Sequence, residues 1–450
     1  MLSKLKSYNQ HFFDRVDPLR FDAFRIVFAL ALMLQFSSYI KFGFIEKGIL
    51  APAFTFHFHF FPFIKPLPAA GLKFALFLTL IGPMLMLFRK TLRTGATIYF
   101  ISFGYLFLLE ESYYNNHFYL ILILTAFYIL FSQKGSTKNN RFVFKWQHDL
   151  FVFMICIVYF FGGLVKLNHD WFLLQQPTRT LLEMNSEAAP FPNLLKSEFA
   201  VYYITYGGLF FDLLIPFLLL LRRTFPYALV LTLIFHITNI FIFNIGEGGN
   251  IGVFPIMMMG ANILFAPQVG FRKLLARFIP GVEPVYKTND KSPDLPVPHN
   301  AKLIRIVVYS FVALQLLLPA RPNVISNRAS WTGQGDFFAW RMKLNNKQVQ
   351  VAYYFQESRD SPRQKINIGR IINTMQINCL GQHADMVYKF AMYLDERMRK
   401  ETGKDMIITA DILVSLNGRE PALLVDSTTD LSRVSYSPFV DPEWVLPAPE

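Results

Sequence analysis

The chain is 450 residues long, 53% of its residues are hydrophobic, and 17% are charged, against about 25% charged in an average soluble domain. Phe alone contributes 49 residues, and the mean hydropathy is +0.32. This composition excludes an ordinary soluble enzyme and a disordered chain. The formal net charge is +13, but the basic residues lie between long apolar segments. The charge therefore indicates membrane topology, and we expect no nucleic-acid partner.

Nine apolar segments have about the length that the hydrocarbon core of a bilayer requires. They are 22–40, 70–88, 95–109, 117–132, 150–166, 201–221, 224–243, 251–268 and 303–320. We therefore expect a polytopic α-helical membrane bundle of about nine transmembrane helices, which occupies residues 1–320 and is embedded in the lipid bilayer.

The loops between these segments alternate in charge. Basic residues occur before the first segment and after the second, fourth, sixth and eighth: Lys4, Lys6, Arg89, Lys90, Arg93, Lys134, Lys138, Arg141, Lys145, Arg222, Arg223, Arg272, Lys273 and Arg277. The loops at 110–112 and 246–249 contain no Lys or Arg. By the positive-inside rule, the N-terminus is cytoplasmic and the C-terminal part of the chain lies outside.

Residues 321–450 differ in composition from the apolar part. The segments 349–355 and 407–414 are typical of strands, and the apolar spacing of 384–400 predicts one amphipathic helix. Asn417-Gly418 is a hairpin turn signal. We expect a small extracytoplasmic α+β domain here, and we interpret the Pro-rich segment 279–300 as a linker ahead of the last span.

Ionisable side chains inside spans are costly, so each one suggests a functional site. His117 opens the fourth segment and Lys166 closes the fifth, while His236 and Asn239 share a helix face in the seventh. The expected run directions bring these four groups to one depth near the outer membrane face. Asp212 lies deeper in the sixth segment, where it is most simply a buried partner for an Arg or a His.

These residues also have structural interpretations. Lys166 at a helix end could extend its amine to the headgroups. His117 could be a helix-entry residue that binds interfacial water, and His236 with Asn239 could be an interhelical hydrogen-bonding pair. The shared depth of the four groups favours a functional site.

The sequence gives little support for a metal centre. Cys156 and Cys379 lie far apart and have no zinc-ligand spacing. His57 and His59 are two residues apart on a loop, which is a weak signal. We therefore expect no metal site.

Several segments match motifs of one family of membrane enzymes. They are Asp17-Pro18 with 24–28, Asn115-Asn116-His117 within 109–120, Lys166-Leu167 with Asp170-Trp171, Phe235-His236 with Asn239, Ile251-Gly252 with Phe254, 331–335 with 338–342, and 415–419. On these motifs, nearly the whole chain resembles the vitamin K-dependent γ-glutamyl carboxylase family, including its shorter bacterial members grouped under the HTTM domain.

The resemblance implies an activity and its co-substrates. Members of this family oxygenate reduced vitamin K, a hydroquinone, to an epoxide with O2. The oxidation generates a base that removes a proton from the γ-carbon of a glutamate in a peptide, and the carbanion then takes up CO2. A lipid-soluble quinol, either reduced vitamin K or a related compound, would reach such a site through the bilayer.

The resemblance also implies roles for individual residues. Lys166 would be the base that starts hydroquinone oxidation, His117 would stabilise the oxygenated intermediate, and His236 would act in epoxide formation. We expect the quinol to be bound by Asn116, Asn239 and Asp212. Where the family has a pair of lysines, this chain has Val165-Lys166.

Two interpretations remain open from the sequence. The first is a membrane enzyme that oxidises a reduced quinone, with or without coupled carboxylation of glutamate. The alternative is a non-enzymatic membrane protein, either a transporter or a quinone-binding or scaffold protein on the same fold. Transporters often show inverted repeats, and the absence of a visible repeat in the sequence favours the enzyme.

Overall fold

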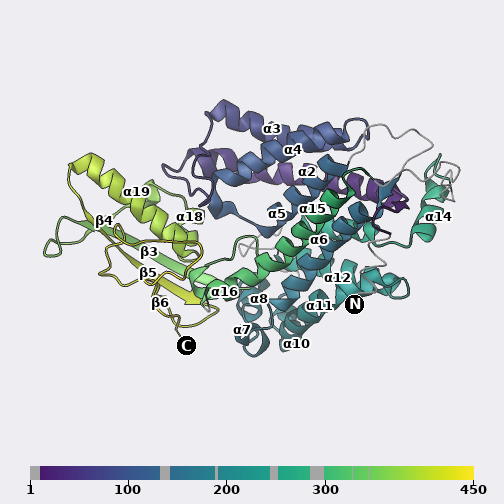
Figure 1. Cartoon of the computed structure of the whole chain (residues 1–450). Helices are drawn as coiled ribbons and strands as arrows, with labels where there is room; N and C mark the ends of the chain where they lie inside the picture. The colour runs from purple at the N-terminus through teal and green to yellow at the C-terminus, as the bar shows by residue number, and fades with distance from the viewer. Residues whose placement is uncertain are drawn as a thin grey trace.

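The computed structural model describes residues 11–131, 142–187, 191–243, 252–283, 298–326, 328–342 and 344–449. A bundle of helices forms most of the molecule, and a β-sheet with one long helix lies at one end of it (Figure 1). The loop expected at 134–141, the loop at 246–249 and most of the linker at 279–300 lie outside the described residues.

Seven helices in the described part of the chain are long and apolar enough to cross a bilayer. They are α2 (Leu19–Phe42), α3 (Ala69–Met86), α4 (Leu92–Leu109), α6 (Lys145–Leu164), the continuous helix Glu198–Leu220, α12 (Phe225–Phe243) and the helix Ala301–Ile325. The helix Glu198–Leu220 comprises α10 (Glu198–Tyr202), the π-helical turn η3 (Tyr203–Gly207) and α11 (Gly208–Leu220), and the last helix begins with α15 (Ala301–Leu317). The protein is therefore built as a multi-helix membrane bundle.

The two remaining expected spans are helical but differ from simple crossings. The fourth is α5 (Asn116–Phe131), which is apolar but shorter than the seven. The eighth is broken: the helix Phe254–Leu264, which begins with α13 (Phe254–Ala261), meets α14 (Gln268–Phe278) at an angle of 108°. Pro267 precedes α14 and lacks the backbone N–H that would continue the ladder of hydrogen bonds. The count of nine spans stays a prediction.

The end of the bundle opposite the sheet is held together by polar contacts. Arg272 of α14 donates to the carboxylate of Asp17 over 2.6 Å. Arg20 donates to the carbonyl oxygen of Leu264 over 3.2 Å, and a ring nitrogen of His148 lies 3.0 Å from the same oxygen. The start of α2, the start of α6 and α14 thus meet at one end of the bundle, far from the sheet (Figure 1).

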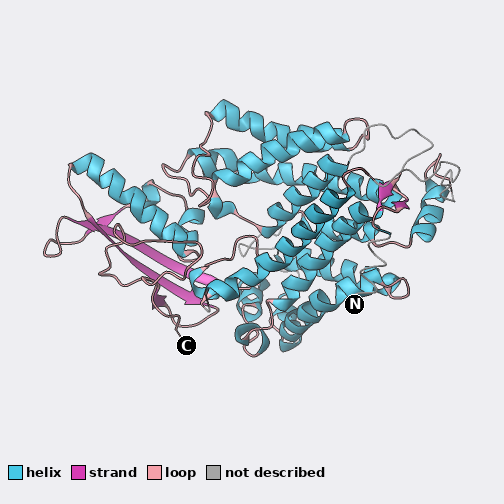
Figure 2. Ribbon diagram, viewed as in Figure 1, coloured by secondary structure: helices cyan, strands magenta, loops and turns pink. Residues whose placement is uncertain are grey.

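The C-terminal part contains a four-stranded antiparallel sheet (Figure 2). Its strand order is β4 (Gln364–Ile366), β3 (Lys347–Gln356), β5 (Ile407–Leu416) and β6 (Ala422–Leu423). Seven of the ten residues of β5 are buried, and they include every second residue from Ile408 to Leu416, as expected where one sheet face is covered. These alternate residues pack in one core with the apolar face of α19 (Ala384–Thr402). Both predicted strands and the predicted helix are present, and Asn417-Gly418 forms a turn with positive φ at both residues.

Buried charged groups connect the bundle to the C-terminal part. Glu110 and Glu111 directly follow α4. Glu111 accepts hydrogen bonds from Lys389 of α19, the shorter over 2.7 Å, and Glu110 accepts one from Gln376 over 2.9 Å. Burial raises the pKa of Glu110 to about 7. Because each of these buried groups has a partner across the junction, they help to fix how the C-terminal part sits over the bundle.

Candidate functional site

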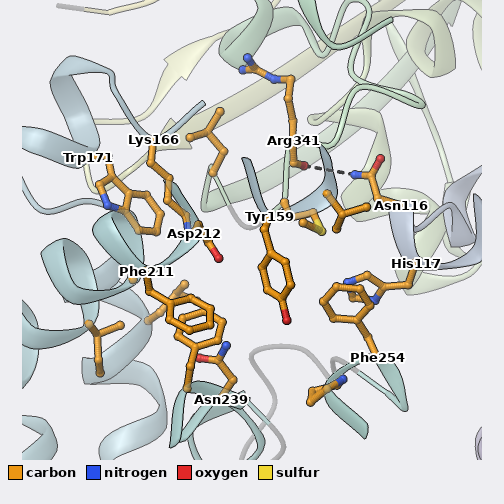
Figure 3. A pocket seen from close by; sticks show the side chains of 18 of the residues that line it. Asn116, His117, Tyr159, Lys166, Trp171, Phe211, Asp212, Asn239, Phe254 and Arg341 are labelled. Carbon is orange, nitrogen blue, oxygen red and sulfur yellow. Dashed lines mark hydrogen bonds and ion pairs between the residues drawn. The ribbon is translucent and has the colours of Figure 1, made fainter. Parts of the chain in front are cut away.

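A cavity of about 660 Å³ lies where the bundle meets the C-terminal part. Its walls come from α5, α6, η3 and α11, α12, α13 and the segments around 336–347 and 382–383. The cavity brings together all six residues that the sequence nominated: Asn116, His117, Lys166, Asp212, His236 and Asn239. Figure 3 shows several of them with the aromatic rings between them.

Lys166 and Asp212 form a buried ion pair on one wall of the cavity. Lys166 Nζ lies 2.5 Å from Asp212 Oδ2, and each side chain is 10% exposed. The Trp171 ring lies 4.9 Å from the same nitrogen and covers it (Figure 3). The lysine thus points into the protein, although it stands at the end of a spanning helix.

The prediction of an Arg or His partner for Asp212 was wrong. We expected an Arg or a His at a deeper level, whereas Asp212 pairs with Lys166. The reason is the length of the lysine side chain, which begins two residues beyond α6 and extends back between the helices. Asp212 therefore belongs to the same layer as the other site residues.

Gly163 explains how the backbones of α6 and α11 come close enough for this pair. A Cβ atom at position 163 would lie 2.8 Å from the backbone nitrogen of Leu213, closer than Cβ atoms come. Leu213 directly follows Asp212, and Gly163 lies three residues before Lys166. The absence of a side chain at one residue therefore sets the distance between the two charged groups.

His236 forms a buried hydrogen bond with Tyr159. The Tyr159 hydroxyl lies 2.7 Å from His236 Nε2, across the contact between α6 and α12. Around the imidazole lie the rings of Phe211, Phe235 and Phe254. Phe211 and Phe235 stack with their centroids 3.9 Å apart, so this wall is flat and aromatic.

His117 lies at the start of α5 and borders the same Phe254 ring as His236. Its ring stacks on Phe254 of α13, with 3.7 Å between centroids and 8° between planes. Its backbone N–H donates to the Asn115 side chain over 3.0 Å, as at a helix N-terminus. Asn116 accepts a hydrogen bond from the Tyr114 hydroxyl over 2.8 Å and donates to the Arg341 carbonyl over 3.4 Å. Both ends of the Asn116 amide therefore have protein partners.

The C-terminal wall of the cavity carries charged residues that the sequence analysis did not nominate. Arg341 pairs with Asp336 over 2.7 Å. Lys347 is partly buried and donates to the carbonyl oxygens of Trp331, over 2.6 Å, and Gln382, over 3.0 Å. Burial lowers the pKa of Lys347 to about 7. These residues lie in a segment of ordinary polarity, where a single charged residue does not indicate a functional site. In the sequence, only the family motif at 331–342 pointed to this part of the chain.

A second polar contact joins two of the motifs that carried the resemblance. Asp170, in the short helix α7 (His169–Phe172), accepts two hydrogen bonds from Arg419 and one from the Asn417 side chain, each over 2.7 Å. The guanidinium and the amide hold the pKa of Asp170 below its usual value. We call this set the Asp170 clamp. It ties the loop after Lys166 to the turn after β5.

The cavity has the character of a site for a small aromatic molecule. Its volume falls within the range of about 300–1,000 Å³ that is typical of ligand pockets. Its walls combine aromatic rings with polar groups from two sides. The bundle contributes Lys166, Asp212, His117, His236 and Asn239, and the C-terminal part contributes Asp336, Arg341, Lys347 and His383. In the described part of the chain, no cluster of three or more His, Cys, Asp or Glu side chains could hold a metal ion.

Fold and site together define a class: an integral membrane protein with a ligand-sized cavity between its helical bundle and a C-terminal α+β part. A model of the HTTM domain matches residues 13–268, more than half of the chain. A model of the vitamin K-dependent gamma-carboxylase lumenal domain matches residues 300–450. The chain belongs to the HTTM-containing vitamin K-dependent gamma-carboxylase family. No solved structure matches the chain.

Proposed function

We propose that this protein oxidises a reduced quinone to its epoxide with O2 and uses the oxidation to carboxylate a glutamate side chain with CO2. The observation that carries the proposal is the buried Lys166–Asp212 pair on the wall of an aromatic cavity. A lysine that anchored a helix at the headgroups would have no need of a carboxylate inside the bundle.

The pair accounts for how a lysine can act as a base. One proton is shared between the amine and the carboxylate. When Asp212 holds it, the Lys166 amine is free to take a proton from a phenolic hydroxyl of the ligand. When Lys166 holds it, the carboxylate stabilises the ammonium, which is largely shielded from solvent because both side chains are 10% exposed. Asp212 is thus the proton partner of the base, besides lining the ligand site.

The remaining groups bind and orient the quinol, which supplies the redox chemistry when it is bound. The stacked rings of Phe211 and Phe235 offer a flat apolar surface for its ring system. His117 and His236 line the cavity with imidazole groups, which can donate to ligand oxygens. Asn239 adds an amide on the side of α12, and Asn116 holds the C-terminal segment in place.

The glutamate would enter from the C-terminal side of the cavity. Asp336, Arg341 and Lys347 line that side, and it belongs to the part matched by the lumenal-domain model. The bundle lies in the lipid phase, from which a prenylated quinol can enter laterally. Quinol and peptide would thus reach one cavity from two phases.

We also infer a topology. The starts of α2 and α6 meet α14 at one end of the molecule, whereas the starts of α5 and α7 contact the C-terminal part at the other. With α5 and the helix Phe254–Leu264 each taken as a crossing, the chain has nine spans. The N-terminus is then cytoplasmic, and residues 321–450 form an extracytoplasmic domain above the membrane domain of residues 1–320.

The decisive experiment compares Lys166→Arg with wild type. Purified protein in detergent is supplied with reduced menaquinone or vitamin K and O2, and the epoxide is measured by mass spectrometry. Arg can replace the charge of Lys166 beside Asp212, but it stays protonated and cannot accept the proton. We expect at least about a 100-fold loss of epoxide per folded protein, in line with the contribution of a general base.

Lys145→Arg serves as the matched control. Lys145 forms a similar contact of 2.5 Å with Asp149 at the other end of α6, away from the cavity. This variant should form epoxide at the wild-type rate. Near wild-type activity of Lys166→Arg would show that Lys166 is not the base, and no epoxide from wild type with any quinol would refute the proposed oxidation.

A further inference from the structure

The hydrogen bond between Tyr159 and His236 limits where the imidazole can carry its proton. Both side chains are almost fully buried, with 3% and 1% of their surface exposed. The Tyr159 hydroxyl lies 2.7 Å from Nε2 of His236. The other ring nitrogen, Nδ1, is buried and has no hydrogen-bond partner among the described residues. A neutral imidazole has one N–H and one acceptor nitrogen, so two arrangements are possible.

In the first arrangement, the Tyr159 hydroxyl donates to Nε2 and the proton of His236 is on Nδ1. One polar group, the Nδ1–H, then lacks a partner. In the second, Nε2–H donates to the Tyr159 oxygen. The hydroxyl hydrogen of Tyr159 and the lone pair of Nδ1 would then both be unsatisfied within the described residues. The first arrangement leaves fewer buried groups unpaired and is therefore favoured.

The unpaired Nδ1–H lies in a residue that lines the cavity. Three aromatic rings, those of Phe211, Phe235 and Phe254, lie around His236, and such rings offer no strong acceptor. A buried donor without a partner costs free energy, and an acceptor oxygen on a ligand would recover it. Quinones and quinols carry such oxygens at the edge of a flat ring, which suits the aromatic walls.

We propose that Tyr159 is a positioning residue that keeps the proton of His236 on Nδ1, so that Nδ1–H is the group that donates to an oxygen of the bound quinone. This inference rests on the proposed function, since it assigns the hydrogen-bond donor for the quinone within the same cavity. It adds a residue from α6 to the site and specifies which atom of His236 meets the ligand.

The first test compares two amide replacements of His236 by the binding of oxidised menadione. Asn places its amide near the position of Nδ1, and Gln places its amide near that of Nε2. Binding can be followed by quenching of tryptophan fluorescence, because Trp171 lines the cavity. We expect His236→Asn to weaken binding less than about threefold and His236→Gln to weaken it about tenfold, the loss of roughly one hydrogen bond.

The second test asks whether Tyr159 acts through His236. Tyr159→Phe should weaken menadione binding about three- to tenfold in the wild-type background, because His236 is then free to move its proton to Nε2. In the His236→Asn background the same change should have almost no effect, since no tautomer remains to be fixed. Tyr128→Phe is the control: Tyr128 is also buried, but its hydroxyl contacts the Phe21 carbonyl, away from the cavity.

Infrared difference spectra of bound menadione give a readout that does not depend on affinity. One carbonyl band should shift to lower frequency in wild type and in His236→Asn, but not in Tyr159→Phe. Tighter binding by His236→Gln than by His236→Asn would overturn the tautomer assignment. An equal loss from Tyr159→Phe in both backgrounds would show a structural role for Tyr159. Failure of wild type to bind any quinone would count against the proposed function itself.

Discussion

A charged amine inside a membrane bundle needs a carboxylate or must lose its proton, and Lys166 has a carboxylate in Asp212. The two residues are 46 positions apart in the chain: Lys166 follows the end of α6, and Asp212 lies in α11. Removing either one leaves the other as a buried charge without a partner. The two are therefore best tested as a unit.

Substitutions of Lys166 and Asp212 can separate the role of the pair in stability from its role in catalysis. Asp212→Leu alone should lower the free energy of unfolding by about 3–5 kcal/mol, because it leaves the Lys166 ammonium unpaired. Lys166→Leu combined with Asp212→Leu should restore the stability to near the wild-type value, since hydrophobic residues can replace a buried ion pair. The double variant should nevertheless form no epoxide.

Thermal unfolding in detergent and the epoxide assay check this prediction on the same preparations. A double variant that folds well and is inactive supports the catalytic role. Retained activity in that variant would mean that the pair serves only to hold α6 against α11.

The site residues were visible in the sequence to different degrees. Lys166, His117 and His236 stand out because polar groups are rare in apolar helices. The pairing of Lys166 with Asp212 was not predictable, because it depends on how far a flexible side chain extends back from a helix end. Arg341 and Lys347 were missed because charges are common in the polar segment that contains them.

At the scale of the helices, Gly163 is the residue that sets the geometry. Gly163→Ala should push α6 away from α11, because the added methyl group would meet the backbone of Leu213 at 2.8 Å. We expect a loss of about 1–3 kcal/mol in stability and a larger fractional loss of epoxide formation, since Lys166 and Asp212 would separate.

Gly104→Ala on α4 is the matched control for this prediction. A Cβ atom there would meet one leucine methyl at 3.7 Å, an ordinary van der Waals contact. Its stability and activity should stay near those of wild type. If Gly163→Ala and Gly104→Ala changed stability and epoxide formation equally, the close contact at Gly163 would not be the cause.

The helices themselves were largely predictable, and the exception has a local cause. Each expected apolar segment is helical, because backbone polar groups in lipid must be satisfied within the segment. Hydropathy alone extended the eighth segment to residue 268, whereas the helix ends at Leu264 and turns by 108° at Pro267. The length of an apolar segment predicts the length of a span, but it does not predict a bend within the helix.

At the scale of the whole molecule, the Asp170 clamp couples the bundle to the C-terminal part. Asp170→Asn should lower the stability at pH 7 by about 1–3 kcal/mol, because it removes a charged hydrogen-bonding group from the clamp. The pKa of Asp170 is lowered in the folded protein, so its contribution is fully present above the ordinary value of 3.8 and is lost as the pH falls further. The difference between wild type and variant should therefore shrink below about pH 4.

Asp411→Asn is the control for the clamp, with melting temperature against pH as the measurement. Asp411 pairs with Arg363 over 2.9 Å within the C-terminal sheet, and both side chains are about one third exposed. Because a pair of this kind contributes little, the variant should melt near the wild-type temperature. A loss from Asp170→Asn that does not change with pH would show that the clamp is not electrostatic.

The inferred topology can be tested by labelling single cysteines from outside intact cells or spheroplasts. With Cys156 and Cys379 replaced, a cysteine at the exposed Ser358 should react with a membrane-impermeant maleimide. A cysteine at the exposed Lys273 should not react. The reverse pattern would place the C-terminal part in the cytoplasm and refute the positive-inside assignment.

The Asp170 clamp also has a consequence for the order of biosynthesis. Lys166 and Asp170 leave the ribosome about 250 residues before Arg419, and domains fold in the order in which they emerge. Until the turn at 417–419 has been synthesised and folded, the loop beside Lys166 lacks the partner that holds it. A nascent or truncated chain therefore has an unfinished cavity, and on the proposed function it would not oxidise quinol before the C-terminal part is in place.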